Sequence, residues 1–181
     1  MRWWLAVCLL LCGLQPVLAQ PSPSHVVLLS TPLVSPAGLA RLQGAAAEAG
    51  LALQVVSAAR DTPETLAAAL KGARLLVIDA PHASVAQAAA ARFGEMVARS
   101  GTPYVLIGEF GLVAKGQALG AAPLSAERGV DPAWAQRLRA YWRFSGAANI
   151  ASAMTALGRV GDMAGLPPPV ELPLAGFYHP G

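Results

Sequence analysis

The chain has 181 residues, of which 55% are hydrophobic and 13% charged, so it can bury one substantial core, and disorder is excluded for most of its length. Its formal charge of +3 comes from arginines scattered along the sequence and from two lysines, Lys71 and Lys115. Nucleic-acid binding requires clustered positive charge, and the sequence has no such cluster. We therefore exclude a nucleic-acid partner.

Residues 1–19 are predicted to be an export signal. Arg2 precedes the apolar stretch Trp3–Leu14, and Val17 and Ala19 stand at the positions of a cleavage site. The alternative is an N-terminal membrane anchor. However, Gln15-Pro16 interrupts the apolar run, which is shorter than the roughly 20 residues of a spanning helix. We therefore expect a periplasmic protein with no stable membrane span after cleavage.

Four apolar runs are predicted to be strands, because each is short and bounded by turn residues. They are His25–Thr31, Leu51–Ser57, Leu75–Ile78 within the stretch Arg74–Pro81, and Tyr104–Gly108. The unbroken run Leu75–Ile78 is typical of a strand buried on both faces, as in a parallel sheet covered by helices. Helical patterns separate the runs and right-handed crossovers connect them. The sequence therefore predicts an α/β domain at 25–130, with a Rossmann-like (flavodoxin-like) doubly wound parallel sheet of about four strands in the order 2-1-3-4.

Helix starts are marked by a capping residue followed by proline. This signal occurs at Ser35-Pro36, Thr62-Pro63 and Asp131-Pro132. A capping box of Ser84 with Gln87 predicts the start of a further helix, which should end near residue 100. The region 109–129 has glycines and little periodicity, and is predicted to be a long loop.

The C-terminal third is predicted to be a helical segment at 131–164 and a proline-rich extended tail at 165–181 that leads to a missing domain. The first helix has aromatic and leucine residues at helical spacing, namely Trp134, Leu138, Tyr141 and Trp142. Arginines lie between them, at Arg137, Arg139 and Arg143. One interpretation is an amphipathic helix that packs its aromatic side chains on the sheet or a neighbouring helix. The other is a binding surface for a flat anionic ligand or a partner protein.

Groups for catalysis or metal binding are sparse. Cys8 and Cys12 lie in the predicted signal, so the mature chain would have no disulfide, thiolate metal site or cysteine nucleophile. His25, His82 and His179 have no metal-ligand spacing. The sequence also has no phosphate-binding glycine loop and no Gly-x-Ser-x-Gly motif, so a small hydrolase is the least favoured interpretation.

The C-terminal motifs resemble the N-terminal region of the CobN/BchH family, the large subunits of aerobic cobaltochelatase and magnesium chelatase. Three stretches carry the resemblance: Tyr141–Ile150, Met154–Leu157 and Pro167–Pro180. In the family an aromatic residue leads to a glycine pair, an asparagine-containing helix, a proline-rich passage and a Gly-aromatic-Tyr-His-Pro signature. Ser145 stands in the first glycine position, and Ala148 stands where an acidic residue is common.

The resemblance implies a Rossmann-like domain and a role in cobalt insertion into a corrin-type tetrapyrrole during cobalamin biosynthesis. It further implies cobalt or magnesium, a tetrapyrrole, other chelatase subunits, and ATP used by those partner subunits. The family's metal-inserting core would follow this chain, so we expect no cofactor within it and no chelation by it alone. The alternative is an exported periplasmic binding or scaffold domain with no chelatase activity.

The candidate ligand site is the carboxyl edge of the predicted sheet, where open α/β sheets place their ligands. Asp79 and His82 follow the central strand and Glu109 follows the fourth, so these three residues are predicted to form one rim. Asp79 could accept a hydrogen bond from His82 or cap the next helix. A tetrapyrrole would lie across this crevice and meet backbone N–H groups at the predicted helix starts near Ser35 and Ser84. The competing location is the helix face with Arg139 and Trp142.

Overall fold

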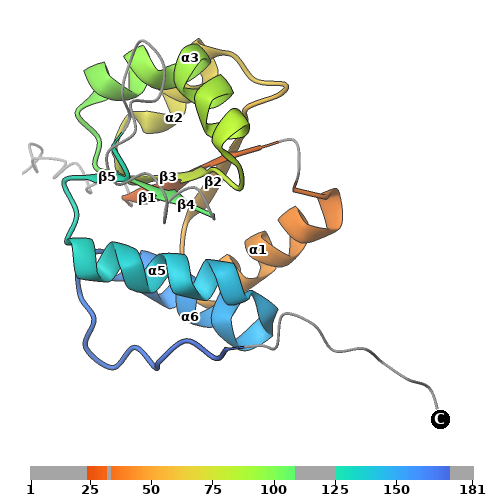
Figure 1. The fold of residues 1–181 in the computed structure, drawn as a ribbon, viewed down its shortest axis with the longest axis vertical. Helices are drawn as coiled ribbons and strands as arrows, with labels where there is room; N and C mark the ends of the chain where they lie inside the picture. The colour runs from red at the N-terminus through yellow and green to blue at the C-terminus, as the bar shows by residue number, and fades with distance from the viewer. Residues whose placement is uncertain (1–23, 32–33, 109–124, 172–181) are drawn as a thin grey trace, which may run out of the picture.

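The computed structural model of the protein describes residues 24–31, 34–108 and 125–171 (Figure 1). The predicted signal peptide lies outside these residues. The elements in chain order are β1 (His25–Ser30), α1 (Pro36–Glu48), β2 (Leu53–Ser57), α2 (Pro63–Leu70), β3 (Ala73–Asp79), α3 (Ala83–Ser100), β4 (Tyr104–Ile107), β5 (Glu127–Arg128), α5 (Pro132–Phe144) and α6 (Gly146–Gly158). Within the described ranges, no helix combines the length and apolar character that a membrane span requires.

The sheet has the order β2-β1-β3-β4-β5. The first four strands are parallel, and their order is the predicted one. The predicted Rossmann-like α/β fold is thereby confirmed. The number of strands is corrected to five, because Glu127–Arg128 pairs antiparallel with β4. This short strand falls within the region predicted to be a loop, of which 109–124 lies outside the described residues.

Alternating strand residues build a core on each face of the sheet, because successive side chains of a strand point to opposite faces. On one face Val27, Leu76 and Ile78 pack with α2 and α3; on the other Val26, Leu75 and Val77 pack with α1, α5 and α6. Figure 1 shows the resulting three layers, with α2 and α3 above the sheet and α1, α5 and α6 below it. The helical segment predicted at 131–164 therefore shares its core with the strands.

Most predicted helix boundaries are found where the capping signals placed them. Ser35, Thr62 and Asp131 are the N-caps of α1, α2 and α5, and each side chain accepts a hydrogen bond from a backbone N–H three residues later. The capping box at Ser84 is wrong. His82 is the N-cap of α3, so Ser84 already lies in the first turn, where its hydroxyl is not in the capping position.

Candidate functional site

The topological switch of the sheet lies between β1 and β3. These strands are neighbours, and the helices that follow them, α1 and α3, pack on opposite faces of the sheet (Figure 1). Thr31 directly follows β1 and Asp79 is the last residue of β3, and the Thr31 hydroxyl donates a hydrogen bond of 3.1 Å to the Asp79 carboxylate. Both side chains are buried. The carboxyl edge therefore contains a hydroxyl–carboxyl pair at the point where this class of fold binds ligands.

Asp79 is a buried acid at the end of the central strand. Burial raises the pKa of its carboxyl above the ordinary value of 3.8, and the hydrogen bonds from Thr31 act in the opposite direction. Only 5% of the residue is exposed to solvent. The native state therefore favours the neutral acid more strongly than the unfolded chain does.

We expect Asp79→Asn to become increasingly stable relative to the wild type as the pH rises from about 4 towards neutrality. Because folding raises the pKa of the Asp79 carboxyl, the neutral acid contributes to the stability of the folded state. This contribution is complete below the unfolded-state pKa and is lost as the pH rises through the folded-state pKa. The asparagine does not ionise, so it avoids this loss. Urea unfolding monitored by circular dichroism at several pH values measures the difference. Thr31→Val removes the hydrogen bond that opposes the rise in the pKa of Asp79. It should therefore extend to higher pH the range over which the protein loses stability through ionisation of Asp79. A difference independent of pH would contradict the interpretation.

The other predicted rim residues are not joined to Asp79. His82 is exposed at the start of α3, and Asp79 receives its side-chain hydrogen bond from Thr31 and not from His82. Glu109 lies outside the described residues. The residue that does meet Asp79 is Thr31, which the sequence places only as the last residue of the first predicted strand. Its signal in the sequence is its position directly after β1, the strand that neighbours β3.

A cavity of about 470 Å³ lies beside this pair, between the ends of β1 and β2 and the helix α1. Its lining includes Thr31, Gln43 and Arg60, but not Asp79. At the start of α1, the Ser35 hydroxyl accepts a hydrogen bond of 3.1 Å from the Gly38 N–H. One of the backbone donors expected to meet a ligand near Ser35 is therefore already satisfied within the helix. By contrast, α3 has no side-chain cap.

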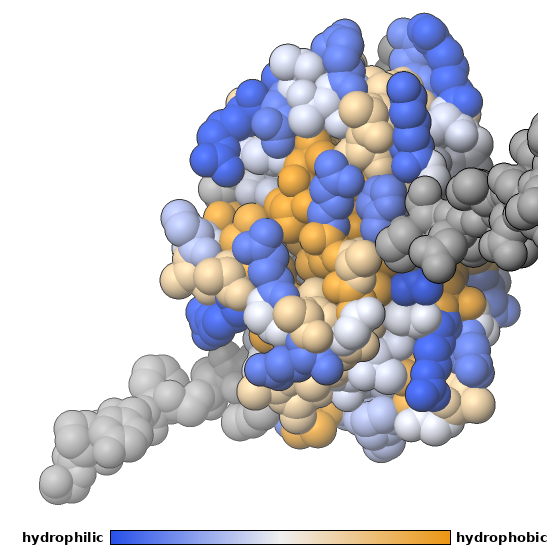
Figure 2. Space-filling view, turned by 180° about the vertical axis from the view of Figure 1, so that it is seen from behind, coloured by the Kyte–Doolittle hydropathy of each residue, from blue (hydrophilic) through white to orange (hydrophobic). Residues whose placement is uncertain are grey.

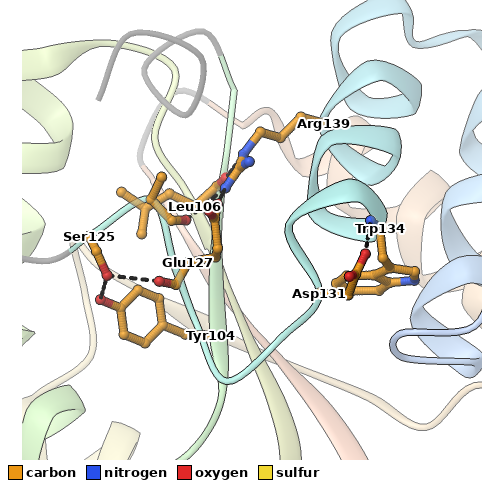
Figure 3. A network of polar contacts seen from close by, with 8 residues as sticks. Tyr104, Leu106, Ser125, Glu127, Asp131, Trp134 and Arg139 are labelled. Carbon is orange, nitrogen blue, oxygen red and sulfur yellow. Dashed lines mark hydrogen bonds and ion pairs between the residues drawn. The ribbon is translucent and has the colours of Figure 1, made fainter. Parts of the chain in front are cut away.

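The competing location on α5 is corrected by the position of Arg139, which is buried and not available on the surface. Its guanidinium donates hydrogen bonds to the carbonyl oxygens of Leu106 (2.9 Å) and Ala126 (2.8 Å) and forms an ion pair with Glu127 (Figure 3). The residue fixes β5 to the end of β4. Arg139 comes four residues after Ala135 and three before Trp142, so it lies within the apolar stripe of α5. This spacing is the sequence signal for its burial.

On the opposite face of the sheet, β5 is fixed by the side chain of its own second residue, Arg128. Its guanidinium donates to the carbonyl oxygens of Val97 and Thr102, at 2.9 Å each, and lies 4.9 Å from the centre of the Tyr104 ring. Glu127 points to α5 and Arg128 to α3. This two-residue strand is thus fixed by an arginine on each face of the sheet.

The proline-rich segment follows the outer surface of α5 and α6. The Tyr141 hydroxyl and the Arg137 guanidinium both donate to the carbonyl oxygen of Pro167. The buried Asn149 side chain forms two hydrogen bonds with the backbone of Val170, donating to its carbonyl oxygen (2.8 Å) and accepting from its N–H (2.9 Å). Sequence reasoning found Asn149 only through the family resemblance. The remainder of the predicted tail, 172–181, lies outside the described residues.

The junction of α5 and α6 has a strained backbone. Ser145 has φ 46° and ψ −149°, and Gly146 has φ 77°. Among the described residues, Ser145 is the only one other than glycine with a positive φ. This is the glycine pair of the family resemblance, with serine in the first position. The conformation explains why glycine suits both positions.

We expect Ser145→Gly to stabilise the protein by about 0.5–1 kcal/mol, because relief of the strained φ exceeds the added entropy of the unfolded chain. The midpoint of urea unfolding, at an unchanged slope, measures the effect. Ser35→Gly is the control, since Ser35 has an ordinary φ of −65° and caps α1. It should lose a few tenths of a kcal/mol. Destabilisation by Ser145→Gly would show that the junction is not strained.

In the described ranges, no three His, Cys, Asp or Glu side chains come together in a group that could hold a metal ion.

Comparison with known proteins gives one informative match. No family model and no curated protein matches the chain. Among solved structures, the catalytic subunit of cobaltochelatase from Mycobacterium tuberculosis matches with a TM-score of 0.50 and 20% identity over 83% of this chain.

The chain shares its fold with part of a cobaltochelatase subunit. It spans 12% of the length of that subunit. At 20% identity the likeness concerns the fold, and it agrees with the Rossmann-like domain that the family resemblance implied.

Proposed function

We propose that the chain is a non-catalytic module of the cobaltochelatase large-subunit type, which assists cobalt insertion into a corrin-type tetrapyrrole by binding the ring. The observation that carries the proposal is the fold shared with a cobaltochelatase catalytic subunit over 83% of this chain. Because the chain spans 12% of that subunit, we assign metal insertion to other parts of the chelatase system. Cobalt is then a substrate of the system, and its partner subunits use the ATP.

The positions that carry the sequence resemblance have specific backbone roles, which supports the proposal. Ser145 and Gly146 adopt positive φ at the turn between α5 and α6, and Asn149 binds the backbone of the proline-rich segment. The turn requires positive φ at two successive residues, and the proline-rich segment is bound by the buried side-chain amide of Asn149. A resemblance at positions with such roles supports the proposal more strongly than a resemblance in composition would.

We place the ring at the carboxyl edge of the sheet. The buried Thr31–Asp79 pair lies at the switch point, and the uncapped start of α3 has backbone N–H groups without side-chain partners. Amide or carboxyl groups at the rim of a tetrapyrrole could accept hydrogen bonds from these donors. His82, exposed at the first position before α3, would lie at the edge of the bound ring.

The test uses the purified full chain and a corrin-type tetrapyrrole, with ring binding followed by absorbance. We expect binding in the micromolar range and, with Co²⁺ and ATP added, no cobalt insertion above the uncatalysed rate. His82→Ala and Asp79→Asn should each weaken binding severalfold, whereas Asp162→Asn, on an exposed turn, should not. Insertion by the chain alone would contradict the non-catalytic role. Absence of binding at high micromolar ring would contradict the role in ring binding.

The alternative is an exported periplasmic binding or scaffold domain with no chelatase activity, which the sequence of residues 1–19 favours. Under both proposals we expect export and a mature N-terminus at Gln20. Fractionation of cells followed by N-terminal sequencing checks this point. Recovery of an intact Met1 from the cytoplasm would contradict export, whereas a mature periplasmic chain that fails to bind the ring would favour the scaffold.

A further inference from the structure

A second cavity lies on the opposite side of α1, between this helix and the turn that joins α5 to α6. Its volume is about 340 Å³. The three helices supply mainly apolar walls: Arg41 and Leu42 from α1, Tyr141 and Trp142 from α5, and Ile150 and Ala153 from α6. The side chains of Leu42, Tyr141 and Ala153 are buried, and those of Trp142 and Ile150 are partly so. Its lining includes neither Thr31 nor Asp79 of the carboxyl edge, and it shares one residue, Val34, with the cavity beside Thr31.

Arg41 is the only charged residue in the lining of this cavity. Its side chain is exposed, and it has no ion pair or hydrogen bond with any other residue in the described part of the chain. Arg139, Arg137, Arg128 and Arg92 differ from it, because the guanidinium of each donates to a backbone carbonyl. The cavity therefore presents one cation that nothing in the described fold uses.

The start of α6 adds to the positive potential at the same wall. Gly146 and Ala147 line the cavity, and Ser145, the N-cap, makes no side-chain capping bond. The first backbone N–H groups of a helix have no partner within the helix, and the helix dipole makes that end positive. An anionic group held by Arg41 would thus meet a second favourable field from the opposite wall.

We propose that this cavity binds a small apolar carboxylate, either an aryl acid or a short acyl acid. The body of the ligand would lie between Trp142 and Ile150, and its carboxylate would pair with Arg41. The volume is at the small end of the range of about 300–1,000 Å³ for ligand pockets, so it suits one or two rings or a short chain and not a tetrapyrrole. The inference does not depend on the proposed function.

The experiment compares acids with neutral amides of the same shape on the purified full chain. The pairs are 2-naphthoate with 2-naphthamide and octanoate with octanamide, titrated by isothermal calorimetry. We expect at least one acid to bind, and to bind about tenfold more tightly than its amide, because only the acid pairs with Arg41. Arg41→Gln should weaken binding of the acid by about tenfold and leave binding of the amide unchanged.

Two further variants locate the site. Arg60→Gln changes an exposed arginine in the cavity at the carboxyl edge and should leave acid binding unchanged. Ile150→Trp fills the cavity and should abolish binding of both members of a pair, with circular dichroism confirming the fold. The proposal is overturned if neither acid binds up to about 5 mM. It is equally overturned if acid and amide bind with the same affinity, or if Arg60→Gln weakens binding of the acid as much as Arg41→Gln does. Corrin binding at the carboxyl edge should be unaffected by Arg41→Gln, so the two proposals can fail separately.

Discussion

Arg139→Met should lower the free energy of unfolding by about 3–5 kcal/mol, the loss expected when one partner of a buried ion pair is removed. The methionine retains the apolar stem but donates no hydrogen bond. Glu127 would then lack its cation, and the carbonyl oxygens of Leu106 and Ala126 would each lose a donor. The Arg139 side chain is 7% exposed and that of Glu127 is 25% exposed, so water replaces the lost contacts only in part. Urea unfolding measures the change.

Two variants make the result specific. Arg143→Met, one turn later on the exposed side of α5, should cost less than about 1 kcal/mol. In a double-mutant cycle, Glu127→Gln combined with Arg139→Met should cost less than the sum of the single changes, because the two side chains contact each other. Additive losses, or equal losses for Arg143→Met and Arg139→Met, would show that the network in Figure 3 does not stabilise β5.

Gly108→Ala should destabilise the protein by about 3 kcal/mol, because the position combines a positive φ with a close backbone approach. Gly108 has φ 93°, and a Cβ there would lie 2.8 Å from the carbonyl oxygen of Ala80 and 3.0 Å from the Cα of Pro81. Both contacts are with backbone that follows Asp79, so the neighbour cannot move aside without shifting the end of β3. Thermal unfolding and urea unfolding both report the loss.

Gly44→Ala is the matched control. Gly44 lies within α1, and a Cβ there would meet no atom within 4 Å. Alanine in an exposed helix interior is favoured over glycine by about 0.5–1 kcal/mol, so this variant should be more stable than the wild type. If the two alanine variants changed stability in the same direction, the close approach at Gly108 would not be the cause.

The fold was predictable where local signals agree with the tertiary structure. The run Leu75–Ile78 is apolar throughout because both faces of β3 are covered by helices. The pairs Ser35-Pro36 and Asp131-Pro132 mark helix starts by chemistry that does not depend on distant residues. The strand β5 could not be predicted, because Glu127–Arg128 is polar and too short for a periodic pattern. It is a strand because its backbone pairs with the distant strand β4, and the Arg139 and Arg128 side chains add contacts that hold it there.

The candidate site was predictable in position but not in composition. The order of β1 and β3 places Asp79 at the switch point, and this follows from the sequence of elements alone. The partner of Asp79 depends on the register of two strands, which pairs Leu29 with Ile78 and so places the two residues after Leu29, Ser30 and Thr31, beside Asp79; the Thr31 hydroxyl makes the hydrogen bond. Nearness in sequence had favoured His82 instead. Likewise, spacing could place Arg139 on α5 but could not show that its guanidinium would bind the backbone carbonyls of Leu106 and Ala126.

The double hydrogen bond between Asn149 and Val170 has a consequence for which sequence changes this protein can accept. The amide contacts only the main chain of Val170, and the Val170 residue is 51% exposed, so residue 170 can vary in side chain without loss of the contact. Its position along the chain cannot vary in the same way. An insertion between Arg159 and Leu166 would move a different residue opposite Asn149 and would displace the carbonyl of Pro167 from Tyr141. Homologous chains with this contact should therefore differ in the identity of residue 170, apart from proline, which lacks the N–H that donates to Asn149, but keep a constant number of residues between it and the asparagine.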